Sequence, residues 1–156
     1  MAREESTPPI AAKLKVFISY SRRNLEFADR LVLALEANGI EVLIDRRDLP
    51  DLEDWRRELL GFIKAADTVV FIISPDSIAS PVCAWEIDQM ATLNKRLAPV
   101  VFVPVENDRI PEAITRINYL HFSTPNDFGT QIRRLVVALE TDATWLKEHS
   151  RLTALA

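Results

Sequence analysis

The sequence is short of the residues that build most metal and disulfide sites. It contains one cysteine, Cys83, and two histidines, His121 and His149, in a chain of 156 residues. A single cysteine excludes an internal disulfide framework and every zinc or iron–sulfur site built from several cysteines. The two histidines lie too far apart in the sequence for a conventional histidine metal cluster. We therefore expect no metal site.

Glycine is also scarce, with three residues, at positions 39, 61 and 129. Neither G-x-G-x-x-G nor G-x-x-x-x-G-K-[ST] can be written with them, which excludes the two glycine-rich loops that cradle nucleotide phosphates. Positive charge does not dominate either, because 19 Lys and Arg stand against 23 Asp and Glu, a net charge of −4. This balance argues against nucleic acid as the primary ligand.

Long apolar runs are missing as well. The longest, residues 68–73 and 98–105, fall far short of the ~20 residues of a membrane-spanning helix, so we expect no membrane segment. Residues 1–12 are charged and lack the apolar stretch of a signal peptide, and we interpret them as a disordered leader. The expected location is the cytoplasm.

What the sequence does contain is an alternation of short β-branched runs with longer stretches of helical period. This pattern predicts an α/β fold, a parallel sheet with helices on both faces. The third and fourth runs are apolar throughout, as strands covered on both faces must be, while the first and last alternate more, which favours positions that are nearer an edge or less covered. The five predicted strands are 14–19, 41–44, 68–74, 99–103 and 119–122.

Helices are predicted between these strands by apolar residues at steps of three and four. The first, from Leu25 to Leu35, ends at Asn38-Gly39, and the third begins with Ser80 as N-cap and Pro81 at its first position. The others carry apolar stripes over 55–63 and 128–139. These elements predict one domain over residues 13–140. We expect residues 141–156 to form a C-terminal helix or a connector to a further module, such as a sensor.

A five-stranded parallel sheet of this length is most often wound in the flavodoxin-like order 2-1-3-4-5. Ligands bind outside the carboxyl ends of the strands where the winding reverses, here between strands one and three. The loops at that point are 19–24 and 74–86, with the loop after strand two beside them. Arg22, Arg23, Arg46 and Arg47 cluster in these loops. They are suited to a pyrophosphate, although pairing with Asp45 and Asp48 explains them equally.

Glu86 is the candidate functional acid. It follows Cys83 by three residues on the third helix, so the two side chains share one face and the carboxylate points either into the cleft or into an expensive burial. The alternative is an exposed glutamate paired with Lys or Arg. Cys83 has no base placed by sequence to activate it, and we interpret it as cleft lining.

The order and spacing of four segments resemble a Toll/interleukin-1 receptor (TIR) domain of the bacterial type, over about residues 13–139. They are K-V-F-I-S-Y-S-R-R-N, V-L-I-D-R-R-D-L-P-D-L-E-D-W, A-D-T-V-V-F-I-I-S-P-D-S and S-P-V-C-A-W-E-I. The sequence departs from the family pattern at Val82, where many relatives have Trp, and at Asp51, where Gly is common. These departures concern loop shape and substrate stacking more than the presence of the acid.

The resemblance implies an enzyme that cleaves the nicotinamide–ribose bond of NAD+, with NAD+ as substrate and no resident cofactor. Glu86 matches the family's catalytic glutamate. It also implies activation by self-association with other TIR domains, as the effector part of a bacterial immune or signalling system. The cleft residues expected to bind substrate are Tyr20, Ser21, Arg22, Asp45, Arg46, Trp55 and Cys83.

Three other functions remain open. A non-catalytic module would recruit other TIR domains through the loop between Asp45 and Trp55. A phosphoacceptor receiver domain shares the fold, but the acidic pair that it needs after strand one is replaced here by Ser19, Tyr20 and Ser21. A nucleoside deoxyribosyltransferase shares both the fold type and a catalytic glutamate.

Overall fold

The computed structural model describes residues 13–46, 54–111, 114, 119–122 and 127–155. The side chains of residues 54–55, 107 and 142–155 are not described. The interpretation of residues 1–12 as a leader therefore falls outside the described residues, as do Arg47 and Asp48.

The five strands form one parallel sheet in the order β2-β1-β3-β4-β5, which confirms the predicted topology. Strand β1 lies between two partners, with Val16 opposite Val42 of β2 and Thr68 of β3. The strand bounds are β1 Lys15–Ser19, β2 Glu41–Ile44, β3 Thr68–Ile73, β4 Arg96–Val101 and β5 Leu120–His121.

Two strand predictions need correction. The alternation in the first run favoured a place near an edge, whereas β1 is interior and buried from Val16 to Ser19, because helices cover both of its faces. Strand β4 begins at Arg96, three residues before the predicted start at Pro99. Pro99 is tolerated because β5 pairs only with Val100 and Val101, so this part of β4 lies at an edge.

The helices begin and end where capping chemistry places them. Ser80 accepts a hydrogen bond from the backbone of Cys83, with Pro81 in the first turn, as predicted, and Gly39 takes the left-handed conformation (φ 81°) after α1. Helix α3 was not predicted, and a capping box between Ser74 and Ser77 begins it. The helices are η2 Arg22–Asn24, α1 Leu25–Ala37, α2 Asp54–Ala65, α3 Pro75–Ile78, α4 Pro81–Thr92, η3 Asn107–Arg109 and α6 Phe128–Leu155.

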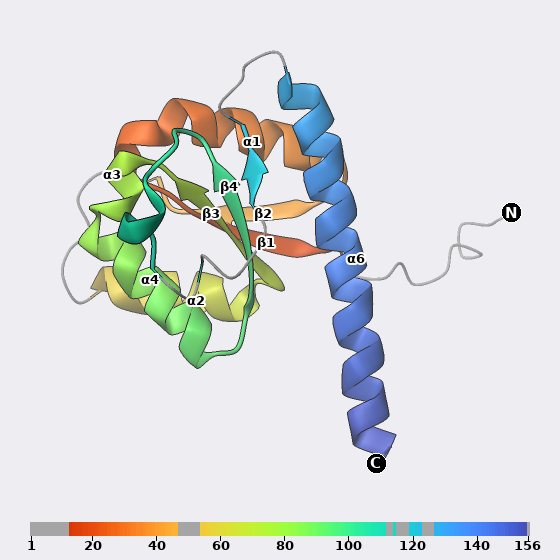
Figure 1. Cartoon of the computed structure of the whole chain (residues 1–156). Helices are drawn as coiled ribbons and strands as arrows, with labels where there is room; N and C mark the ends of the chain where they lie inside the picture. Colours follow the sequence, from red (N-terminus) through yellow and green to blue (C-terminus); the bar gives the residue numbers. More distant parts are fainter. Residues whose placement is uncertain (1–12, 47–53, 112–113, 115–118, 123–126, 156) are drawn as a thin grey trace, which may run out of the picture.

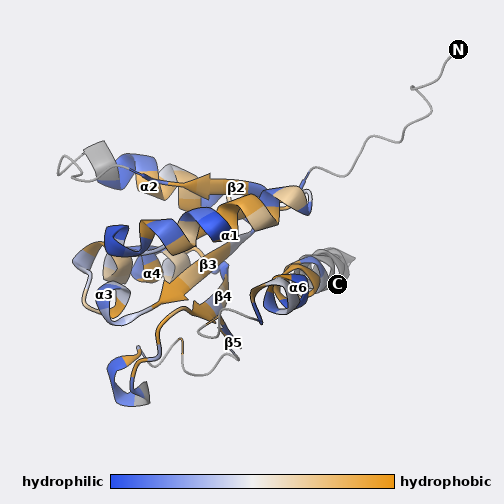
Figure 2. Cartoon of the chain, turned by 90° about the horizontal axis from the view of Figure 1, so that it is seen from above, coloured by the Kyte–Doolittle hydropathy of each residue, from blue (hydrophilic) through white to orange (hydrophobic). Residues whose placement is uncertain are grey.

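Two apolar cores lie on the two faces of the sheet. One joins the sheet to α1 and α6 through side chains such as Leu31 and Leu135, and the other joins it to α2 and α4 through Leu59 and Ile87. Figure 1 shows these helix pairs on opposite sides of the strands. In Figure 2 the strands are largely apolar, whereas the helices carry both polar and apolar residues. Because helices pack against both faces, the strands and their carboxyl ends are held in defined positions.

Helix α6 extends further than the predicted fourth helix, which ended at Leu139. It runs without a break from Phe128 to Leu155, and Figure 1 shows its second half continuing past the sheet. The interpretation of residues 141–156 as a connector stays a prediction. No helix within the described ranges combines the length and apolarity needed to cross a membrane.

Candidate active site

The candidate site lies at the carboxyl ends of β1 and β3, where the winding of the sheet reverses. Ser19 is the last residue of β1, and the η2 turn follows it with Ser21 as its N-cap. Beyond β3, the short helix α3 leads into α4, which carries Cys83 and Glu86. These elements bring residues from distant parts of the chain together, as the topology predicts.

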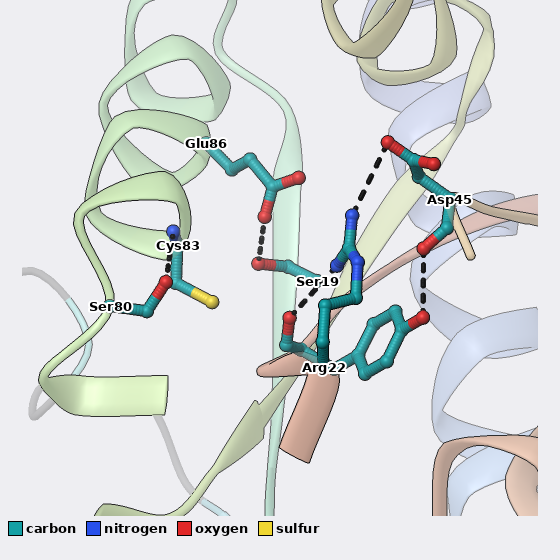
Figure 3. A network of polar contacts seen from close by, with 7 residues as sticks. Ser19, Arg22, Asp45, Ser80, Cys83 and Glu86 are labelled. Atoms are coloured by element: carbon teal, nitrogen blue, oxygen red, sulfur yellow. Dashed lines mark hydrogen bonds and ion pairs between the residues drawn. The ribbon is translucent and has the colours of Figure 1, made fainter. Parts of the chain in front are cut away.

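Glu86 is buried, not exposed, with 1% of its surface accessible. Its face of α4 is shared with Cys83, Ile87 and Met90, which pack into the core. Ser19 donates a hydrogen bond from Oγ to Glu86 Oε1 at 2.7 Å (Figure 3). The interpretation of Glu86 as a solvated surface residue is therefore wrong.

Burial raises the pKa of Glu86 from 4.5 to about 7, because a carboxylate loses its hydration inside the protein. The hydrogen bond from Ser19 and the positive charge of Arg22 lower this pKa, and the negative charge of Asp45 raises it. A carboxyl group in this range changes its charge near neutral pH. Such perturbed groups in a crevice are candidates for catalysis.

Arg22, Asp45 and Tyr20 form a second group beside Glu86. Arg22 Nη2 lies 3.3 Å from Asp45 Oδ2, and the Tyr20 hydroxyl donates to the backbone oxygen of Asp45 at 2.8 Å (Figure 3). The guanidinium carbon of Arg22 also lies 4.7 Å from the centre of the Tyr20 ring, a cation–π distance. These contacts tie the segments that follow β1 and β2 to each other.

Tyr20 and Cys83 are held in their neutral forms. Burial raises the pKa of Tyr20, and it raises that of the Cys83 thiol to about 12, with a further contribution from the charge of Glu86. Since the thiolate is the nucleophile, Cys83 has no means of attacking a substrate at neutral pH. Cys83 is 1% accessible and packs in the apolar core with Ile87 and Met90, so its role as cleft lining stays a prediction.

The remaining predicted residues lie apart from this group or outside the description. Ser21 is buried and accepts a hydrogen bond from the backbone of Arg23. Arg46 forms an ion pair with Asp29 of α1, at 2.6 Å, instead of contacting Glu86. The side chain of Trp55 is not described. Arg23 is 83% exposed and lies 3.9 Å from Asp76. Each of the three described arginines of the predicted cluster thus lies within ion-pair distance of a carboxylate, and only Arg22 has a partner that was expected, Asp45.

A polar hollow of about 330 Å³ opens beside α4. It is lined by Ser21, Arg23, Asp76, Ala79 and Ser80, so it lies between the segment after β1 and the turn that links α3 to α4. Ser80 caps the helix that carries Glu86, but Glu86 itself is not among the residues that line the hollow. Within the described ranges, no three His, Cys, Asp or Glu side chains gather as a metal ion would need.

Sequence reasoning missed two sets of polar contacts. It gave no role to Ser19, although a serine at the end of a buried strand was the available signal. It also missed the hydrogen bonds that join the β1 and β3 ends, from Ser74 Oγ to Asn24 Oδ1 at 2.6 Å and from Asn24 Nδ2 to Asp76 Oδ2 at 3.4 Å. No spacing rule links these residues, because they lie about fifty positions apart.

The winding of the sheet and the buried acid at its switch point define a flavodoxin-like α/β domain with a polar site between the first and third strands. A family model described as "TIR domain" matches residues 16–136. The chain therefore belongs to the TIR domain family, in its bacterial-type branch.

Several solved structures share this fold. The TIR domain of the Toll-related receptor TRR-2 from Hydra magnipapillata is 21% identical, with a TM-score of 0.67 over 80% of this chain and 97% of that one. The TIR domains of the activated Roq1 resistosome are 18% identical, with a TM-score of 0.60 over 81% and 99%.

A third similar structure is an enzyme. The CMP N-glycosidase BcmB of Clostridium botulinum is 19% identical, with a TM-score of 0.55 over 78% of this chain and 97% of that one. At these identities the likeness establishes the fold alone. The comparison with curated protein sequences gave no match.

The buried charge of Glu86 predicts a pH-dependent cost in stability. Because its pKa is raised by folding, the free energy of unfolding falls as pH rises from about 4.5 to about 7, by about 3 kcal/mol in total. Glu86→Gln keeps the shape and an oxygen that accepts from Ser19 but carries no charge. We expect the variant to melt several degrees above the wild type at pH 8 and near it at pH 4.5. Equal melting temperatures at both pH values would contradict this account.

Proposed function

We propose that this TIR domain is an NAD+ glycohydrolase that cleaves the bond between nicotinamide and ribose, with Glu86 as the catalytic residue. The observation that carries the proposal is a buried carboxylate with a pKa near neutrality, placed where the winding of the sheet reverses. An acid with no role would not be kept there, because burial of a charge is costly. The family match and the resemblance of the S-P-V-C-A-W-E-I segment support the same reaction.

The chemistry requires one carboxylate. The bond between ribose C1 and the ring nitrogen breaks with its electron pair on nitrogen, so the positively charged pyridinium leaves as neutral nicotinamide without a proton. The ribosyl group becomes an oxocarbenium-like cation, which the ionised Glu86 stabilises by its charge. Water then adds to C1 and releases a proton to give ADP-ribose, or the adenine of the same substrate adds to give a cyclic product.

The charges around the crevice favour a cationic leaving group. Among the described residues, Glu86 and Asp45 are both close to the guanidinium of Arg22, and the neighbouring Arg46 is paired with Asp29, so carboxylates outnumber guanidinium groups. A pyridinium ring is attracted by this excess of negative charge. A cytosine base is neutral and needs a proton to leave, and only the protonated fraction of Glu86, which falls as the pH rises above about 7, could supply one. We therefore favour NAD+ over the nucleotide substrate named for the similar glycosidase.

Activation by self-association follows from the burial of the acid. With 1% of its surface accessible, Glu86 contacts a ribose only after the segments around it move. The ion pair between Arg22 and Asp45 joins two of those segments, so the described arrangement is a closed one. We propose that neighbouring copies open it. The exposed apolar side chains of Leu33 on α1 and Val137 on α6, 68% and 61% accessible, are the contacts we assign to them.

Glu86→Gln is expected to reduce nicotinamide release from NAD+ by roughly a thousandfold or more, because the amide has no charge to stabilise the cation. Liquid chromatography of the nicotinamide formed by concentrated protein measures the loss. Glu36→Gln removes an exposed glutamate of α1 and is the matched control, with wild-type turnover expected. Retained turnover in Glu86→Gln, with a native circular dichroism spectrum, would reject the assignment.

Turnover per molecule is expected to rise with protein concentration and on a scaffold that clusters the chain. The double variant Leu33→Ser, Val137→Ser should lose most of this rise while it keeps the weak activity of dilute wild type. Initial rates over a hundredfold range of protein concentration measure it, alongside light scattering of the same samples. A turnover number that stays constant over that range would show that the isolated domain is active without partners.

A further inference from the structure

We propose that Ser19 is the positioning residue for the catalytic carboxylate, holding one oxygen of Glu86 so that the other faces the crevice. This inference rests on the proposed function, because it concerns how the catalytic carboxylate is oriented. Its basis is the 2.7 Å hydrogen bond from Ser19 Oγ to Glu86 Oε1, which joins the end of β1 to α4. That length is typical of a well-formed O–H···O hydrogen bond.

Ser19 is well suited to hold another side chain still. It is fully buried, and its backbone pairs with Phe71 of β3 while the preceding Ile18 pairs with Ile44 of β2. A serine has a single side-chain torsion, so little freedom remains once the strand is fixed between two partners. The side chain of Glu86 on α4 is thereby attached to a buried interior strand of the sheet.

The second oxygen of Glu86 is left for the substrate. In Figure 3 it points away from Ser19, to the side where Arg22 and Asp45 lie. A carboxylate fixed through one oxygen presents the other in a defined direction, and misplacement of a reacting group is costly in rate. Ser19 thus acts through Glu86 and has no need to touch the substrate.

The hydrogen bond from Ser19 also lowers the pKa of Glu86. Among the described residues, the titratable or charged groups that act on Glu86 are Arg22 after β1, Asp45 after β2 and Cys83 on α4, and Tyr20 lies against Arg22 and Asp45. Arg22 provides positive charge, Asp45 provides negative charge, and the tyrosine and thiol are neutral. The Ser19 hydroxyl and Arg22 favour the ionised form, so loss of the hydroxyl moves the pKa of Glu86 upward.

The test compares Ser19→Ala with Ser19→Thr, which keeps the hydroxyl, in the full chain. For Ser19→Ala we expect the acidic limb of kcat/KM for NAD+ to move upward by about one pH unit. On the alkaline plateau kcat should fall about tenfold with KM little changed, since the substrate contacts remain. Ser19→Thr should restore both. The control is Ser74→Ala, which removes another buried hydroxyl at the same sheet edge. Its acidic limb of kcat/KM should stay at the wild-type pH.

A titration independent of activity separates this inference from the proposed function. The side-chain carboxyl carbon of Glu86, labelled with ¹³C and assigned by its loss in Glu86→Gln, reports the pKa by NMR. A higher pKa in Ser19→Ala than in wild type and Ser74→Ala supports the positioning role, even if NAD+ is not cleaved. Equal pKa values in all three, or an equal rise in Ser74→Ala, would overturn it. If Ser19→Ala does not fold, Ser19→Cys, with a weaker donor of similar size, takes its place.

Discussion

A carboxylate held inside the protein is the constraint on which the rest of this structure depends. Leaving Glu86 ionised away from water is unfavourable, and the protein offsets part of that cost with the Ser19 hydroxyl and the charge of Arg22. The offset is incomplete, which is why the pKa of the acid lies near 7 instead of its ordinary value. An acid balanced in this way is partly ionised at neutral pH, and its charged form is poorly solvated, so that charge acts strongly on a nearby cation.

The scaffold makes this balance possible. Parallel strands covered by helices on both faces hold Ser19 in place, and a capped helix directs Glu86 toward it. The contacts of Arg22 with Asp45 and Tyr20 then link the segments that follow β1 and β2. The cost of the buried charge lowers the free energy of unfolding of the whole domain, and the two apolar cores on either side of the sheet offset it.

Much of this arrangement could be predicted from the residues. Strand order, the caps at Ser80 and Gly39, and the shared face of Cys83 and Glu86 all follow from local periodicity and from one rule of topology. Periodicity failed for β1, because alternation in a five-residue strand does not distinguish an edge from an interior strand.

The contacts of the site were harder to predict, since they depend on the direction of single side chains. Sequence spacing could not choose between burial and exposure for Glu86, nor pair Arg46 with Asp29 on a distant helix. The partner of the acid, Ser19, lies 67 residues away and carries no motif of its own. Tertiary packing decides such contacts, and only the folded chain reveals them.

We expect the negatively charged site to select a substrate with a cationic leaving group, and a comparison of substrates tests this most directly. Concentrated protein is incubated separately with NAD+, NADH, CMP and free nucleosides, and the products are identified by mass. Consumption of NAD+ alone, with free nicotinamide and ADP-ribose or its cyclic form as products, is the predicted result. Release of base from CMP or a nucleoside, or NAD+ recovered intact, would contradict it.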